Sequence, residues 1–110
     1  MKTYNKLVRD KIPQIIEDNG GQAQIRILSD EEYLIYLEAK LDEEVGEYHR
    51  DQTPEELADI LEVVYALANA KDISREALMD IYRRKHDSRG GFEKKLLLIA
   101  SGKEPRVKVQ

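Results

Sequence analysis

Four acidic residues stand in two pairs of equal spacing. Glu44 and Glu47 lie three positions apart in "KLDEEVGEY", and Glu56 and Asp59 repeat that spacing in "PEELADIL". Residues three positions apart lie on the same side of a helix. Two helices packed against each other could therefore bring all four carboxylates to one place.

Carboxylates on the packed faces of helices need a compensating positive charge, because an unpaired buried charge costs several kcal/mol. Lys40 is the one base near these acids in the pattern, so the acids outnumber it. An all-oxygen ligand set suits Mg²⁺ or Mn²⁺ better than Zn²⁺. Since Mg²⁺ is commonly shared with phosphate oxygens of a substrate, the pattern predicts phosphate-ester chemistry.

An ordinary explanation also exists for the acidic pairs. Glu is a strong helix former, and Glu-x-x-Glu is common on solvated helix faces. Glu55 and Glu56 also suit the first turn of a helix, where acids are favoured. Asp59 does not fit this explanation, because Asp is a poor helix former and lies in an apolar sector.

Two basic clusters, "NKLVRDK" and "YRRKHDSR", could contact phosphate groups. Their ordinary role is that of solvated surface charge. Gly90 and Gly91 could let the backbone approach a phosphate, or they could simply end a helix. His49 and His86 are expected on the surface. The candidate phosphate contacts are Lys6, Arg9 and Lys11 from the first cluster, and Lys85 and Arg89 from the second.

Composition limits the class of protein. The chain has 110 residues, of which 41% are hydrophobic and 36% charged, and it has no cysteine. We expect a single domain over residues 1–110, cytoplasmic, without disulfides, a thiolate metal site or a membrane span. The formal charge of −4 argues against a nucleic-acid partner.

Capping signals predict a mostly helical chain. Ser29 with Glu32 forms a capping box, and Thr53-Pro54-Glu55-Glu56 repeats the signal. Residues 22–28 and 92–100 are the candidates for short extended segments. The predicted helices run over about residues 10–17, 29–50, 53–70 and 74–88, with Asp10, Ser29, Thr53 and Ser74 as their N-caps.

The helical repeat indicates which residues share a face on each of the two predicted helices that carry the acids. On the helix over residues 29–50, Glu44, Glu47 and Lys40 share one edge of the core stripe, while Glu43 turns toward solvent. The helix over residues 53–70 is apolar on nearly every side, and its Glu56 and Asp59 point inward or into a cleft. A chain of 110 residues can bury the apolar surface of such a helix only in part. We therefore expect a homodimer with a shared helical bundle, or alternatively a tetramer.

The joined segments "KLDEEVGEY" and "EELADILEVVYAL" resemble the MazG-like nucleotide pyrophosphohydrolases of the all-α NTP pyrophosphatase superfamily. The family motif is Glu-x-x-Glu, a gap, then Glu-x-x-Asp, and the gap is short here. The flanks "YNKLVRDKIPQII" and "RGGFEKKLLL" resemble a small single-domain branch, described as phosphoribosyl-ATP pyrophosphohydrolase-like.

This resemblance implies an all-α bundle and a Mg²⁺-dependent hydrolase that cleaves a nucleoside triphosphate into a monophosphate and pyrophosphate. It implies Glu47 as a helping base and Lys40 as a group that orients a ligand carboxylate or contacts phosphate. Two alternatives stay open: hydrolysis of phosphoribosyl-ATP in histidine biosynthesis, and a non-catalytic helical oligomerisation module. The metal ligands that the resemblance implies are Glu44, Glu47, Glu56 and Asp59.

Overall fold

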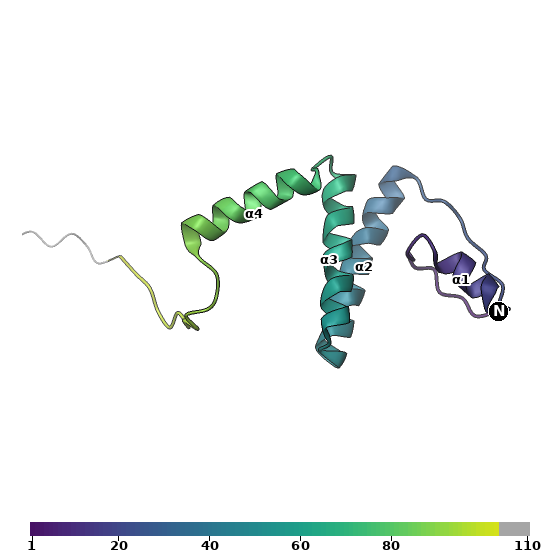
Figure 1. Ribbon diagram of the computed structural model, residues 1–110, viewed down its shortest axis with the longest axis horizontal. Coiled ribbons are helices and arrows are strands. Elements are labelled where there is room, and N and C mark those ends of the chain that lie inside the picture. Colours follow the sequence, from purple (N-terminus) through teal and green to yellow (C-terminus); the bar gives the residue numbers. More distant parts are fainter. Residues whose placement is uncertain (104–110) are drawn as a thin grey trace, which may run out of the picture. The chain divides into compact units, whose positions relative to one another are not determined.

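The part of the chain that the structure describes, residues 1–103 of a computed structural model, contains helices and no strand (Figure 1). The predicted all-α class is therefore confirmed. Residues 22–28 and 92–100 belong to no helix, so these two segments run as irregular chain. The helices are α1 (Ile12–Asp18), α2 (Asp30–Asp51), α3 (Pro54–Ala70) and α4 (Arg75–Arg89).

The chain divides into two compact units, and the boundary between them falls within α4. The first unit, Met1–Leu78, contains α1, α2 and α3 together with both acidic pairs. The second unit, Met79–Gln110, carries most of α4 and the segment that follows it, of which residues 79–103 are described. Each unit is considered by itself below.

The beginnings of α2 and α3 follow the predicted caps. The Glu32 amide donates to Ser29 Oγ at 3.2 Å, and the Ser29 amide donates to Glu32 Oε1 at 3.1 Å. At α3, the Glu56 amide donates to Thr53 Oγ1 at 3.4 Å. Each cap supplies an acceptor for amides that have no partner within the helix. The two helix starts are therefore fixed by the local sequence.

Gln52 connects α2 to α3 in a left-handed backbone conformation, with φ of 51°. Its amide donates to the Tyr48 carbonyl oxygen at 2.7 Å, which closes the last turn of α2. The chain then reverses within a few residues, so α2 and α3 form an antiparallel hairpin (Figure 1). The acid-bearing end of α2 consequently faces the beginning of α3.

The start of α1 differs from the prediction. Asp10 was expected to cap this helix, but the N-cap is Lys11, without a side-chain hydrogen bond. The Ile12 amide donates to the Arg9 carbonyl oxygen at 3.0 Å, so a backbone turn replaces the side-chain cap. At α4 the prediction is confirmed, since the Ala77 amide donates to Ser74 Oγ at 3.1 Å.

The core of the first unit lies between α2 and α3, which pack along their lengths. Its most buried apolar side chains among the described residues are Leu37, Val63 and Ala68. Leu57 and Leu61 of α3 remain about half exposed, at 51% and 49%. The described chain thus buries a small core and leaves part of α3 uncovered. None of its described helices has the length and apolar content needed to cross a bilayer.

Candidate metal centre

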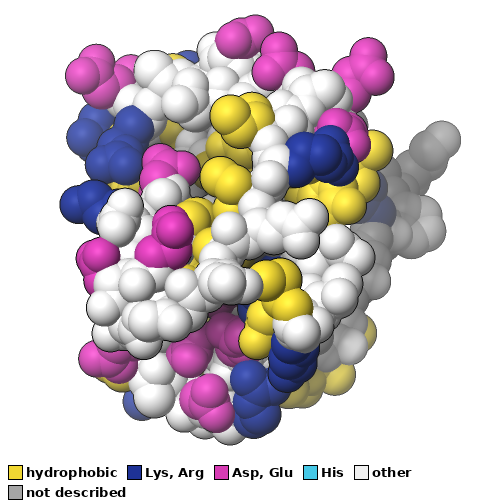
Figure 2. All heavy atoms as spheres, turned by 90° about the vertical axis from the view of Figure 1, so that its right-hand side faces the viewer, with side chains coloured by type: hydrophobic (Ala, Val, Ile, Leu, Met, Phe, Trp, Pro, Cys, Tyr) yellow, Lys and Arg dark blue, Asp and Glu magenta, His cyan; other side chains and the backbone are white. Residues whose placement is uncertain are grey.

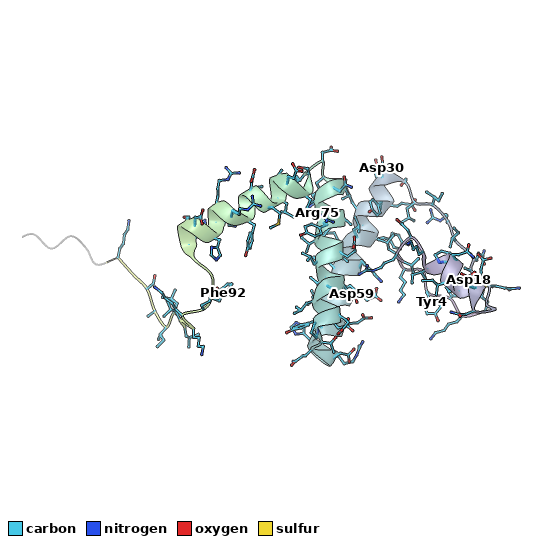
Figure 3. All side chains as sticks on the ribbon, in the orientation of Figure 1. Tyr4, Asp18, Asp30, Asp59, Arg75 and Phe92 are labelled. Carbon is cyan, nitrogen blue, oxygen red and sulfur yellow. The ribbon has the colours of Figure 1, made fainter. Side chains whose placement is uncertain are left out.

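The antiparallel hairpin brings the four predicted metal ligands together. Glu44 and Glu47 project from α2, and Glu56 and Asp59 project from α3. One carboxylate oxygen from each residue lies within 4.8 Å of the corresponding oxygens of the other three. Figure 3 shows Asp59 on α3, at the level where this helix runs beside α2. The equal spacing in the sequence is therefore matched by proximity in space.

Two of these carboxylates are only partly satisfied. Glu44 is buried, with 6% of the residue exposed. Glu44 Oε2 and Glu56 Oε2 are both shielded from solvent, and neither has a hydrogen-bond partner among the described residues. Buried polar atoms are almost always paired in folded proteins. The two oxygens therefore mark a place where a further ligand would be stabilising.

The electrostatic environment favours protonation of two of the four carboxylates, Glu44 and Glu56. Burial raises the pKa of the Glu44 carboxyl, the nearby Lys40 ammonium opposes this rise, and the charge of Glu47 adds to it. Burial also raises the pKa of the Glu56 carboxyl, and the negative charges of Glu47, Asp51, Asp59 and Glu44 reinforce the effect. Both shifts mean that the fully ionised cluster is costly without added positive charge.

The donor set fits a hard divalent cation. All four groups are carboxylates, two carry a shielded oxygen without a partner, and their ligand atoms are close enough to share one ion. Oxygen-only sites are typical of Mg²⁺ and Mn²⁺, whereas Zn²⁺ prefers nitrogen and sulfur ligands. A cation of this kind would also offset the burial and the mutual repulsion that raise the pKa of the Glu44 and Glu56 carboxyls.

Among the described residues, Lys40 is the less exposed of the two cations that contact the cluster, the other being Arg9. Its Nζ lies 3.3 Å from Glu44 Oε1 and 3.1 Å from Glu43 Oε2, and 14% of its side chain is exposed. Glu43 also accepts from Lys6 Nζ at 2.9 Å. Burial alone would raise the Glu43 pKa, but the two lysines outweigh it and hold this pKa below its ordinary value.

These contacts correct two sequence expectations. Glu43 was expected to turn toward solvent, yet its half-buried side chain joins Lys6 to Lys40. Lys40 was expected to be the one base at hand, yet Arg9 also reaches the acids, with NH2 2.7 Å from Asp59 Oδ1. The helical repeat could not place the N-terminal segment, because that segment approaches the hairpin only through tertiary contacts.

A cavity of about 390 Å³ adjoins the carboxylates within the first unit. Glu44 and Asp59 line it together with the cationic side chains of Arg9, Lys11 and Lys40. Two further acids, Asp10 and Glu62, also line it, and the rest of the wall comes from Leu7, Val8, Tyr33, Leu37, Val63 and Ala66. The cavity therefore offers positive charge next to the acids and an apolar surface elsewhere.

The predicted phosphate contacts divide between the units. Arg9 and Lys11 line the cavity, whereas Lys6 binds Glu43 instead. Lys85 and Arg89 lie on exposed positions of α4 in the second unit, where the Gly90 amide ends the helix by donating to the His86 carbonyl oxygen. Glu62 was missed by the sequence reasoning. It lies 3.7 Å from Arg9, and its position three residues after Asp59 was the available signal.

Comparison with known proteins gives one partial relative. The chain is 52% identical over 48 residues to an uncharacterized protein of Mycolicibacterium smegmatis, an alignment that covers 44% of this chain and 49% of that protein. The chain thus spans about half the length of the relative it matches. No family model and no solved structure matches the chain. Membership of the MazG-like family stays a prediction.

Proposed function

We propose that this protein is a Mg²⁺-dependent nucleotide pyrophosphohydrolase, which cleaves between the α and β phosphates and releases pyrophosphate. One observation carries the proposal: four carboxylates share a space of 4.8 Å, two of them with a shielded and unpartnered oxygen. The adjoining cavity is lined by Arg9, Lys11 and Lys40. Carboxylates beside cationic side chains are what a metal-bound polyphosphate requires.

Glu44, Glu47, Glu56 and Asp59 would hold Mg²⁺, or Mn²⁺ in its place. When bound, the ion would supply positive charge to the phosphate oxygens and lower the pKa of a coordinated water. The remaining contributions come from the chain itself. Glu47 would accept the proton of the attacking water, and its carboxylate belongs to the same cluster.

Lys40 and Arg9 would each act on both the protein and the substrate. Lys40 Nζ lies 3.3 Å from Glu44 Oε1, so it keeps this buried carboxylate in place at the wall of the cavity. Arg9 presents a planar guanidinium that can bind two phosphate oxygens at once. Lys11 adds a further positive charge along the same wall. The apolar wall that includes Tyr33 and Val63 would receive the uncharged part of the nucleotide.

The same proposal includes a homodimer of the all-α NTP pyrophosphatase type, with a tetramer as its alternative. Leu57 and Leu61 of α3 are about half exposed, and the most buried described apolar residues are few. A second copy that covers α3 would remove this apolar surface from water.

An assay of pyrophosphate release tests the function and names the substrate. The purified protein is incubated with Mg²⁺ and a panel of nucleoside triphosphates, with phosphoribosyl-ATP as a separate arm. Release from one or a few triphosphates supports the proposal, while release confined to phosphoribosyl-ATP assigns the related reaction of histidine biosynthesis. Silence across the panel would contradict both and leave the non-catalytic oligomerisation module.

A further inference from the structure

The segment that follows α4 exposes an unusual amount of apolar side chain. Phe92 is 97% exposed and Ile99 is 90% exposed, and the three leucines between them are at least 80% exposed. Figure 3 shows Phe92 in the chain beyond α4, outside any helix. Large contiguous apolar surfaces of this kind mark interaction sites in soluble proteins. We call residues 92–99 the apolar arm.

The apolar arm belongs to a basic part of the chain. Residues 79–103 contain seven lysines and arginines against three acidic residues. Lys94 and Lys95 directly precede the leucines. Residues 30–62 have the opposite character, with thirteen acidic residues against two basic ones. The protein therefore carries a basic apolar segment and a strongly acidic helical hairpin.

The acidic hairpin also has an exposed apolar stripe. Leu57, Ala58 and Leu61 lie on one side of α3 and are exposed, and the exposed Glu55 and Glu62 follow one edge of that side. Figure 2 looks onto another side of the molecule, that of α1 and the N-terminal segment, where hydrophobic side chains also lie open among charged ones. We call Leu57, Ala58 and Leu61 the α3 stripe. It offers apolar contact with acidic groups beside it.

We propose that the apolar arm of one copy of this protein packs on the α3 stripe of a second copy, with Lys94 and Lys95 placed toward the acids of that copy. The contact would bury the exposed leucines of both surfaces and pair opposite charges. Reciprocal packing of two arms would give a closed two-fold dimer. This contact does not depend on the proposed enzymatic activity, since neither surface includes Arg9, Lys11 or Lys40, the cationic residues that line the cavity.

A membrane is the competing occupant for a basic apolar segment. The observations favour a second copy, because the thirteen acids of residues 30–62 would be repelled by an anionic lipid surface. The same acids attract the arm of another molecule. Binding to anionic vesicles therefore enters the test as an opposing outcome.

Disulfide trapping tests the contact directly, because the chain has no cysteine of its own. Leu98→Cys and Leu61→Cys are purified separately with tags of different mass, mixed and oxidised. The proposal expects a mixed disulfide between the two variants. Leu98→Cys mixed with Asp18→Cys, an exposed position on α1, is the matched control. A yield no higher with Leu61→Cys than with Asp18→Cys would overturn the proposal.

Light scattering and sedimentation give the second readout. Leu97→Glu should raise the dimer dissociation constant at least tenfold, whereas Ser101→Glu, which adds the same charge at a nearby exposed position, should leave it near wild type. Circular dichroism checks that both variants stay helical. If Leu97→Glu does not fold, the disulfide-trapping experiment alone tests the contact. A monomeric wild type, an unchanged constant in Leu97→Glu, or a monomer that binds anionic vesicles through Leu97 would overturn the proposal.

Discussion

Arg9 and Asp59 are fifty positions apart in the chain, yet Arg9 NH2 lies 2.7 Å from Asp59 Oδ1. Arg9 NH1 also approaches Glu62 Oε1 at 3.7 Å. The pair ties the N-terminal segment to α3 and occupies one oxygen of a predicted metal ligand. Arg9 therefore supplies positive charge to the carboxylate cluster. A bound cation would share Asp59 with Arg9, and a bound phosphate would share the Arg9 guanidinium with Asp59.

Replacing Arg9 with Ala separates these roles. Mn²⁺ binding to the free protein should become tighter by about two- to fivefold, because an exposed ion pair of up to about 1 kcal/mol no longer competes for Asp59. The value of kcat/KM should fall by about 10- to 100-fold, since a charged contact to phosphate is lost. Calorimetric titration of Mn²⁺ and steady-state kinetics measure the two effects.

Lys11→Ala is the matched control for Arg9→Ala. Lys11 lines the same cavity. Its removal should lower kcat/KM and leave the Mn²⁺ affinity of the free protein near wild type. Equal kcat/KM in wild type and in both variants would mean that Arg9 and Lys11 are ordinary solvated charges with no role in binding phosphate.

Asp59→Asn tests the predicted metal ligand. The wild-type melting temperature should climb with Mn²⁺, since a ligand at a hundredfold excess over its Kd adds about 2.7 kcal/mol to the free energy of unfolding. The variant should lose most of that climb, while its metal-free stability should change by no more than about 1 kcal/mol, the worth of an exposed ion pair.

Glu55→Gln is the control for Asp59→Asn, because Glu55 is exposed in the first turn of α3 and lies outside the four-carboxylate cluster. Glu43 would be unsuitable, since it holds Lys6 and Lys40. A metal-dependent rise in melting temperature that survives in Asp59→Asn would argue against this residue as a ligand.

Lys40→Met should destabilise the metal-free protein. The change keeps the apolar stem but leaves the buried Glu44 without its ammonium partner at 3.3 Å. Losing the partner of a buried charged group costs about 1–3 kcal/mol. Urea denaturation measures this cost, with Lys71→Met as the control, because within residues 1–103 the Lys71 ammonium is paired with Glu38 at 4.0 Å and both side chains are exposed. Equal losses in both variants would mean that Lys40 has no special structural role.

The raised pKa of Glu56 predicts a pH-dependent difference between wild type and Glu56→Gln. The unfolded chain has the ordinary value of 4.5, so folded wild type binds this proton more tightly than the unfolded chain does. Its contribution to stability is complete below that value and is lost as the pH rises through the raised folded pKa. Without metal, Glu56→Gln should therefore melt above wild type at pH 7.5, and the gap should close near pH 4.

Saturating Mn²⁺ should reverse that order at pH 7.5, because the ion stabilises wild type and binds the variant weakly. Differential scanning calorimetry at both pH values, with and without Mn²⁺, checks the two signs. If the Glu56→Gln variant melts below wild type in the absence of metal, the raised pKa of the Glu56 carboxyl is contradicted.

Local signals predicted the hairpin well. Ser29, Thr53 and Ser74 cap their helices as the sequence indicates, because cap hydrogen bonds involve residues only three positions apart. The spacing of the acidic pairs also predicted their meeting, since two short-range helical repeats and one tight connection determine it.

Contacts made across long stretches of chain were not predicted. The pairing of Arg9 with Asp59 and of Lys6 with Glu43 depends on how the N-terminal segment packs, which no local periodicity encodes. The expected Asp10 cap was wrong because the Arg9 carbonyl oxygen accepts the Ile12 amide instead. The apolar character of residues 92–99 was evident in the sequence, whereas their exposure outside any helix was not.

Pyrophosphate release by wild type and by Glu44→Gln, each with Mg²⁺ and with a chelator, tests the central claim most directly. The proposed function predicts release from a nucleoside triphosphate that needs Mg²⁺ and falls at least about 100-fold in Glu44→Gln, since an ion that no longer binds tightly cannot stabilise the developing charge. Circular dichroism would show that the variant stays helical. Release that continues unchanged in the chelator or in a folded Glu44→Gln, or no release from any nucleotide, would contradict the claim.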